Sequence, residues 1–328
     1  METRQIGPLS VSLVGLGCNQ VGLKVDLPGT RELVAAALEA GITMFDTADS
    51  YAGGESERLL GSALAGKRNE AIIATKFGSK VGETAGGARP EYLRVAVEQS
   101  LGRLQTDWID LYQLHRPDPT VPIEETLGAL GELVTAGKVR AIGHSNFSPP
   151  QIDAAAAVDA STQFASAQNE WSLVERSAEN GVVPAAERNG LAIIPYYPLA
   201  SGVLTGKYLQ GETIDSSWRL APADARRRGQ RLNPEVLSTV EKLKSYATDR
   251  QYTTLELAFS WLASHPAVGS IIAGATNPDQ VTSNATAPRW KLTTEELADV
   301  DALTAHRLSA DTRAEGKNPA GRAAATGS

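Results

Sequence analysis

Cysteine is almost absent from this chain of 328 residues, which contains Cys18 alone. A single cysteine excludes a disulfide within the chain and fits a reducing compartment, so we expect a cytoplasmic protein. Long apolar runs are also missing, since no stretch approaches the ~18 apolar residues that a membrane span requires. The first residues, METRQ, resemble neither a signal peptide nor a transit peptide. We therefore expect no membrane association.

An excess of positive charge is also lacking. The chain has 31 Lys and Arg against 38 Asp and Glu, which gives a formal net charge of −7. This balance provides no basic field to attract nucleic acid or anionic lipid, so we expect no nucleic-acid partner. What the chain does contain is 42% hydrophobic residues, a value typical of a globular protein and too high for a disordered one.

Short apolar runs alternate with segments of helical periodicity, which is the pattern of βαβ units around a parallel sheet. The sequence predicts an N-terminal β-hairpin near Gly7 and Pro8, followed by eight buried strands. These strands are expected over residues 13–17, 43–46, 71–76, 108–115, 139–143, 166–168, 191–196 and 270–274. Eight βα units in succession favour a closed (β/α)8 barrel, that is, a TIM barrel.

The helices between these strands show the expected signals. One apolar stripe of the helix after the third strand is made by Leu93, Val97, Leu101 and Leu104. Another, after the fourth strand, is made by Ile123, Leu127, Leu130 and Val134. The first helix is expected to end at Gly41, because glycine is common just after a helix C-terminus.

An open Rossmann sheet is the alternative fold, and it would need a Gly-rich phosphate loop after the first strand. The segment GLGCNQ (15–20) has Gln20 in place of the third glycine, which disfavours this fold. We predict a single barrel domain over residues 1–306. A long loop after the seventh strand, over 199–234, has the size of a functional insertion. Residues 307–328 have the composition of a disordered tail.

Polar residues end three consecutive predicted strands. Asp46 ends the second strand, Lys76 the third and His115 the fourth, and Tyr51 lies in the loop that follows Asp46. Active sites of barrels form at the carboxyl ends of the strands, so these four side chains are expected on one rim. Each has an ordinary structural explanation alone, as a turn cap, a solvated charge, a structural histidine or a packing residue. Their combination on one rim predicts a catalytic site.

This set of groups suits proton transfer. A tyrosine titrates near ~10 in water, and a neighbouring ammonium lowers that pKa, here by an expected two to three units or so. Asp46 would hold Lys76 in place, and His115 would donate a hydrogen bond to a carbonyl oxygen or relay a proton to Tyr51. No metal is required, because His115 has no second His or Cys at ligand spacing. A G-x-S-x-G nucleophile motif is absent as well.

Several strings in this order resemble the aldo-keto reductase family, in particular bacterial aldo/keto reductases and the β-subunits of potassium channels. They are DTADSY (46–51), GGESE (53–57), TKF (75–77), LYQLH (111–115), GHSNF (143–147) and GVLTGKY (202–208). The likeness runs from about residue 6 to about residue 303. It implies a catalytic tetrad of Asp46, Tyr51, Lys76 and His115, with Tyr51 as the general acid in reduction and the general base in oxidation.

The resemblance also implies a binding site for NADPH (NADP+). Ser145, Asn146 and Gln168 would hydrogen-bond the nicotinamide carboxamide, and Tyr196 would stack on the nicotinamide ring. The remaining residues expected at the cofactor are Leu199, Ser201, Gly202, Lys207, Arg219, Gly274, Thr276, Gln280 and Asn284. Backbone amides at Gly274 and at the start of the following helix are expected to receive phosphate.

Some positions depart from the family pattern. The loop after the eighth strand lacks the basic residues that many relatives place there, with Gly274, Thr276 and Gln280 instead, so NADH is a possible cofactor too. Lys207 and Arg219, and with less weight the run 226–228, are candidates for supplying the missing charge. His144 and Trp171 also depart from the common residues, and we expect them to change pocket shape or packing rather than the reaction.

The sequence therefore predicts an NADPH-dependent oxidoreductase that reduces an aldehyde or ketone to an alcohol. Two alternatives stay open: an NADPH-binding regulatory subunit with little turnover, and a specialised reductase of a keto-sugar or natural-product intermediate. Substrate-facing loops are expected at 19–24, at 77–89 and around Trp171. The sequence settles neither the small-molecule carbonyl substrate nor the oligomeric state.

Overall fold

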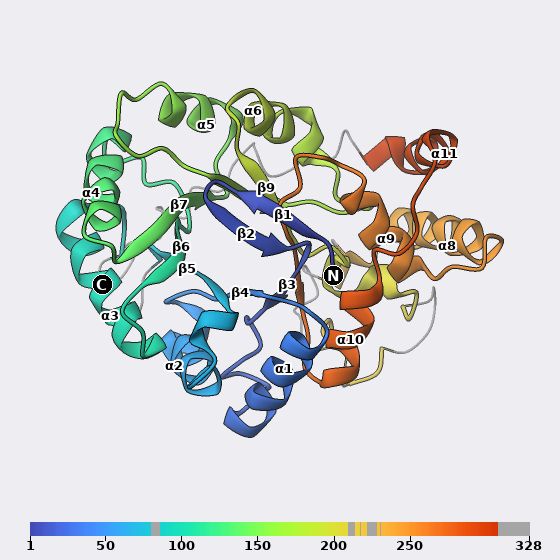
Figure 1. Cartoon of the computed structure of the whole chain (residues 1–328). Coiled ribbons are helices and arrows are strands. Elements are labelled where there is room, and N and C mark those ends of the chain that lie inside the picture. The colour runs from blue at the N-terminus through green and yellow to red at the C-terminus, as the bar shows by residue number, and fades with distance from the viewer. Residues whose placement is uncertain (80–85, 209–213, 217, 222–227, 230, 308–328) are drawn as a thin grey trace, which may run out of the picture.

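The structure is a computed structural model that describes residues 1–307 apart from 80–85, 209–213, 217, 222–227 and 230. Its centre is a closed barrel of eight parallel strands with helices around the outside (Figure 1). The strands are β3 (Val14–Gly17), β4 (Met44–Asp46), β5 (Ile72–Phe77), β6 (Ile109–Leu114), β7 (Val139–Ser145), β8 (Ser166–Glu170), β9 (Ala192–Tyr196) and β10 (Ile271–Gly274). β10 pairs with both β3 and β9 and so closes the barrel. The predicted (β/α)8 barrel is confirmed.

An N-terminal hairpin covers one end of this barrel. β1 (Thr3–Ile6) pairs antiparallel with β2 (Leu9–Ser12) around a turn at Gly7, where φ is +53°. A Cβ at Gly7 would also lie 2.8 Å from that of Ala165, so glycine is required there for conformation and for space. The hairpin buries Ile6, Leu9 and Val11 against residues of the barrel interior, namely Met44, Ala74, Leu111, Ala141, Ile194 and Ile272. The predicted hairpin is confirmed, and it closes the amino end of the barrel.

The strands are connected by α-helices and by short 3-10 helices, which are labelled η. The α-helices are α1 (Leu27–Glu39), α2 (Glu55–Ala63), α3 (Pro90–Leu104), α4 (Ile123–Thr135), α5 (Pro149–Ala156), α6 (Val182–Arg188), α8 (Pro234–Thr248), α9 (Thr254–Ala263), α10 (Pro278–Thr286) and α11 (Thr294–Thr304). The 3-10 helices are η1 (Tyr51–Gly54), η2 (Arg68–Glu70), η3 (Ser177–Asn180), η4 (Ala200–Thr205) and η5 (Ala305–Arg307). Within the described residues, no helix is long and apolar enough to cross a membrane.

Local sequence explains where several helices begin and end. Asp26 caps α1 by accepting a hydrogen bond from the backbone of Gly29 at 3.0 Å. Thr253 and Thr293 begin α9 and α11 with capping boxes, in which a glutamate three residues later bonds back to the cap. The predicted end of the first helix is confirmed, because α1 stops just before Gly41, which adopts φ +79°.

The helices bury their predicted apolar faces against the barrel. All four stripe residues of α3 are buried, and α2 packs beside α3. A Cβ built on Gly61 would lie 2.3 Å from the carbonyl oxygen of Leu104, so α2 and α3 approach closely at this glycine. At the other end of the chain, Arg307 closes η5 and donates a 3.0 Å hydrogen bond to the carbonyl of Val174. The tail was predicted from residue 307, but Arg307 belongs to η5, and residues 308–328 lie outside the described residues.

Candidate active site

A cavity of about 980 Å³ opens at the carboxyl ends of the barrel strands. Of the residues predicted for the site, Lys76 lies buried beneath the cavity and the others line it. The lining set is Asp46, Tyr51, His115, Ser145, Asn146, Gln168, Tyr196, Leu199, Ser201, Gly202, Lys207, Arg219, Gly274, Thr276, Gln280 and Asn284. The predicted catalytic and cofactor residues thus share one continuous space.

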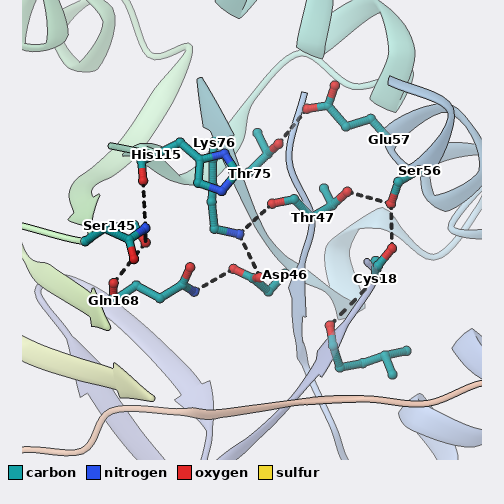
Figure 2. A network of polar contacts seen from close by, with 12 residues as sticks. Cys18, Asp46, Thr47, Ser56, Glu57, Thr75, Lys76, His115, Ser145 and Gln168 are labelled. Atoms are coloured by element: carbon teal, nitrogen blue, oxygen red, sulfur yellow. Dashed lines mark hydrogen bonds and ion pairs between the residues drawn. The ribbon is translucent and has the colours of Figure 1, made fainter. Parts of the chain in front are cut away.

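Asp46 and Lys76 form a buried ion pair at the ends of the neighbouring strands β4 and β5 (Figure 2). Lys76 Nζ lies 2.7 Å from Asp46 Oδ2 and donates a second hydrogen bond of 2.8 Å to the carbonyl of Thr47. Asp46 Oδ1 accepts a 2.8 Å hydrogen bond from Gln168 Nε2 across the barrel. Both charges are therefore paired, as buried charges must be.

Tyr51 is brought over this pair by the loop that leaves β4. The loop is held to β5 by backbone hydrogen bonds from Thr47 to Ala74 and from Asp49 to Lys76. Lys76 Nζ lies 5.1 Å from the centroid of the Tyr51 ring. The rings of Tyr51 and His115 meet edge-on, with centroids 5.9 Å apart and planes at 75°. The four residues of the predicted tetrad are therefore brought together.

The pKa of Tyr51 differs from the expectation, whereas Lys76 is charged as expected. Burial raises the pKa of Tyr51, the Lys76 ammonium lowers it and Asp46 raises it, and the net direction is upward. The expected net lowering is wrong for the protein without a ligand, because the loss of water around the phenol outweighs the ammonium. Burial lowers the pKa of Lys76, but Asp46 and Tyr51 together raise it by more than burial lowers it. The net direction is upward, so this amine stays charged.

His115 is neutral in this setting. Burial lowers its pKa to about 3, and the positive charges of Lys76 and Arg116 act in the same direction. Ser79 Oγ lies 3.2 Å from His115 Nδ1 and fixes the ring. A neutral imidazole carries one N–H, so His115 can act as a hydrogen-bond donor and not as a cation.

The residues predicted for the nicotinamide are linked to each other at the ends of β7, β8 and β9. Asn146 adopts φ +63° and donates hydrogen bonds of 3.0 Å to the carbonyl of His115 and to Ser145 Oγ. Tyr196 donates a 2.7 Å hydrogen bond to Asn146 Oδ1. Ser145 Oγ donates in turn to the carbonyl of Gln168 at 2.9 Å. This network orients the amide groups that face the cavity.

A second part of the lining is formed by the long loop after β9. Ser201 and Gly202 have positive φ values of +63° and +92°, and Ser201 Oγ is buried without a hydrogen-bond partner among the described residues. Lys207 and Arg219 come from the same loop. Burial and the nearby Lys24 ammonium lower the pKa of Lys207. A buried hydroxyl and two cations that one loop contributes to the cavity lining suit a phosphate group.

Two other expectations for the phosphate region turn out differently. The backbone N–H of Thr276 donates to Gln280 Oε1 at 2.8 Å, and that of Gln280 donates to Asn277 Oδ1 at 3.0 Å. These amides at the start of α10 are thus already hydrogen-bonded by side chains of neighbouring residues. In the run 226–228, the first two residues lie outside the described residues, and Arg228 bonds the carbonyl of Ala221 and does not line the cavity.

Two of the three predicted substrate-facing segments contribute described residues to the cavity lining, and Trp171 does not line it. The loop 19–24 lines the cavity through Asn19, Gln20, Leu23 and Lys24. From the loop 77–89, Ser79 lines the cavity, and residues 80–85 lie outside the described residues. Trp171 was expected beside the pocket but is fully buried, with its ring 5.5 Å from Trp261 and its Nε1 donating to Glu179 at 2.9 Å. Its role is packing, which was the other effect expected of it.

Tyr197 and Arg116 are among the residues that line the cavity near the tetrad and that the sequence did not predict. Tyr197 has φ +54° and contributes to the electrostatics of Tyr51. Arg116 follows His115 directly and lines the cavity as well. The available signal for both was their position beside a residue at a strand end, since the residue next to a catalytic strand end often shares its rim.

The profile of the aldo/keto reductase family matches residues 13–305. The chain belongs to the aldo/keto reductase family. Aldo-keto reductase YhdN of Bacillus subtilis (strain 168) is 36% identical to it over 310 residues, which cover 92% of each protein. A probable voltage-gated potassium channel subunit beta of Oryza sativa subsp. japonica is 33% identical over 272 residues, covering 80% of this chain and 83% of the rice protein.

Solved structures agree with this assignment. A glycerol dehydrogenase from Gluconobacter oxydans is 33% identical with a TM-score of 0.80, covering 93% of this chain and 96% of that one. An aldo-keto reductase from Bacillus halodurans, solved in a holo form, is 31% identical with a TM-score of 0.78 and the same two coverages. Aldo/keto reductases generally bind NAD(P)H and act on small carbonyl substrates, so this chain is an oxidoreductase of that family.

Within this aldo/keto reductase, His144 occupies an unusual environment on the outer side of β7. Its ring stacks on Phe147 with centroids 4.3 Å apart and meets Phe164 edge-on. Neither ring nitrogen has a hydrogen-bond partner among the described residues. Burial lowers the pKa of His144 to about 3, so the residue is a neutral part of the core. Pocket shape and packing were the two effects expected of His144, and its place in the core fits packing, since it does not line the cavity.

Proposed function

We propose that this chain is an NADPH-dependent reductase that converts an aldehyde or ketone to an alcohol in the cytoplasm, with Tyr51 as general acid. The observation that carries the proposal is the position of Tyr51 over the Asp46–Lys76 ion pair, next to a neutral His115, at one end of a cavity of about 980 Å³. A cavity of this size and mixed polarity is typical of a cofactor and substrate site.

The residues present fit a nicotinamide dinucleotide at two separate places. At the catalytic end, Ser145, Asn146 and Gln168 offer amide and hydroxyl groups from the ends of the two strands β7 and β8. At the other end, the unpartnered Oγ of Ser201 and the cations Lys207 and Arg219 would hold phosphate. The bound dihydronicotinamide would supply the hydride that reduces the carbonyl carbon.

NADPH is proposed as the main cofactor because cations line the phosphate region, and NADH is proposed to bind as well. No Lys or Arg occurs in the sequence between residues 271 and 286, although Thr276, Gln280 and Asn284 of this stretch line the cavity. Asp279 adds a carboxylate to the same wall. The 2′-phosphate would therefore depend on Lys207 or Arg219, from the opposite loop, and its contribution to affinity should be modest.

The proton is proposed to come from the Tyr51 hydroxyl. As negative charge develops on the carbonyl oxygen, Tyr51 donates its proton, and the Lys76 ammonium stabilises the phenolate that remains. In the tautomer in which His115 Nδ1 accepts from Ser79, Nε2 carries the hydrogen and can bond the same oxygen. In the oxidation direction the phenolate takes the proton back.

The test is the Tyr51→Phe variant, assayed for NADPH consumption over a panel of aldehydes and ketones. Loss of one proton donor should lower kcat by about 10²- to 10⁴-fold. Quenching of tryptophan fluorescence by NADPH should be unchanged, because the ring stays in place. A Tyr51→Phe enzyme that keeps full activity would show that another group is the acid.

A regulatory subunit is the second candidate, because one relative is named as a probable potassium channel subunit beta. A binding subunit and an enzyme of narrow specificity both predict tight cofactor binding. They differ in turnover: a regulatory subunit should reduce none of a broad carbonyl panel, including keto-sugars. An enzyme should reduce at least one member rapidly. The intact tetrad favours turnover.

A further inference from the structure

The described lining of the cavity is richer in cations than in anions. Its basic side chains are Lys24, Arg116, Lys207 and Arg219, and its acidic side chains are Asp46 and Asp279. Asp46 is neutralised by the buried Lys76. Lys207 and Arg219 belong to the phosphate region of the proposed cofactor site. Arg116 is different, because it follows the catalytic His115 in the chain.

Arg116 has the properties of a ligand-binding residue and lacks those of a structural one. Its side chain is exposed, and it makes no hydrogen bond or ion pair with the residues that the structure describes. Other arginines of this chain tie the fold together through buried carboxylates: Arg68 bonds Asp110 at 2.6 Å, and Arg231 bonds Glu170 at 2.5 Å. Among the residues with described positions, Arg116 has no such partner.

The charge of Arg116 reaches the catalytic centre. It acts with Lys76 on the imidazole of His115, which shows that the guanidinium lies within electrostatic range of the group that would face the carbonyl oxygen. Consecutive Cα atoms are only ~3.8 Å apart, so the two side chains start from almost the same point on the rim. One small molecule can therefore contact both.

We infer that Arg116 binds an anionic group of the substrate, a carboxylate or a phosphate, while the carbonyl lies against Tyr51 and His115. The substrate class is thus a short aldehyde or ketone that carries a negative charge. This inference rests on the proposed reductase function. Chemically, a guanidinium presents a planar set of N–H donors that matches both carboxylate and phosphate, and it stays charged at any working pH.

The test compares matched substrates. A series of straight-chain aldehydes that end in a carboxylate, of increasing length, is assayed beside the primary amides of the same length. A phosphorylated aldehyde and its unphosphorylated parent form the second arm and separate phosphate from carboxylate. For the preferred length, we expect kcat/KM of the anionic member to exceed that of the neutral one by about tenfold or more, mainly through KM.

The Arg116→Gln variant should remove this preference. Its kcat/KM for the neutral aldehydes should stay within about twofold of the unaltered protein, and Arg116→Lys should keep part of the preference. Arg94→Gln is the matched control, because Arg94 is an exposed residue of α3 that pairs with Glu132 at 2.8 Å and does not line the cavity. It should leave the preference intact.

Three outcomes decide the matter. Equal rates for charged and neutral members, at every length and in both arms, would overturn the role of Arg116 and leave the proposed reductase standing. An Arg116→Gln variant that loses neutral and anionic activity alike would also overturn it. If the unaltered protein reduces no aldehyde of the series and no aldehyde or ketone of the carbonyl panel, the proposed function fails, and this inference fails with it.

Discussion

Gln168 Nε2 donates a 2.8 Å hydrogen bond to Asp46 Oδ1, while Lys76 bonds the other oxygen of the same carboxylate at 2.7 Å. Gln168 lines the cavity from β8, and Lys76 lies beneath the phenol of Tyr51. Asp46 therefore links a residue proposed to bind the cofactor to the ammonium proposed to stabilise the phenolate. A substitution at Gln168 should therefore change the environment of Lys76, and a substitution at Lys76 that of Gln168.

Removal of the Asp46 charge should damage both stability and chemistry. In Asp46→Asn the Lys76 ammonium would stay buried without its counter-charge, which costs about 3–5 kcal/mol of unfolding free energy. The pKa of Lys76 should fall, and kcat with it, since a neutral amine stabilises the phenolate poorly. Urea unfolding and a kcat–pH profile would measure the two effects.

The double variant Asp46→Asn/Lys76→Met is the control for this prediction. It removes both charges, so its loss of stability should be smaller than the sum of the two single losses. Additive losses would mean that the two residues contribute independently and that the ion pair is not what stabilises this rim.

His144 should make the protein sensitive to mild acid. Its pKa is lowered from 6.5 to about 3 in the folded protein, so the unfolded chain binds more protons between these values. The stability that depends on a neutral His144 is fully present above pH 6.5 and is lost as the pH falls toward 3. His144→Leu should reduce this loss and raise the free energy of unfolding at pH 7 by about 1–2 kcal/mol, because no unpaired ring nitrogen is buried.

Chemical denaturation at pH 7 and pH 5 would measure both parts of this prediction. The difference in unfolding free energy between His144→Leu and the unaltered protein should be larger at pH 5. A variant that is less stable at both pH values would indicate that the imidazole packs between Phe147 and Phe164 better than an aliphatic group does.

Gly61 should tolerate no side chain. An added Cβ would stand 2.3 Å from the Leu104 carbonyl oxygen, and backbone cannot move away as a flexible side chain can. Gly61→Ala should therefore force α2 and α3 apart and lower the unfolding free energy by about 1–3 kcal/mol. The matched control is Gly102→Ala in α3, where a Cβ meets no atom within 4 Å. This control should be neutral or more stable by about 0.5–1 kcal/mol, since alanine favours helix.

The sequence was informative where a local pattern decides the structure. The strands were predictable because each is a short buried run, and the tetrad was predictable because parallel strands bring their ends to one rim. Trp171 was misplaced because its position after β8 is next to the rim, whereas its ring packs on Trp261, which is 90 residues away in the chain. The net pKa direction of Tyr51 was missed because it depends on burial, which no local pattern gives.

The N-terminal hairpin has a kinetic consequence. Because Ile6, Leu9 and Val11 seal the floor of the barrel, the cavity opens only toward the loops above β3 to β10 in the part of the chain that the structure describes. Cofactor and substrate would enter through the same opening and cannot pass each other inside the cavity. The one that contacts the deeper residues therefore has to bind first and dissociate last, and its release can then limit kcat.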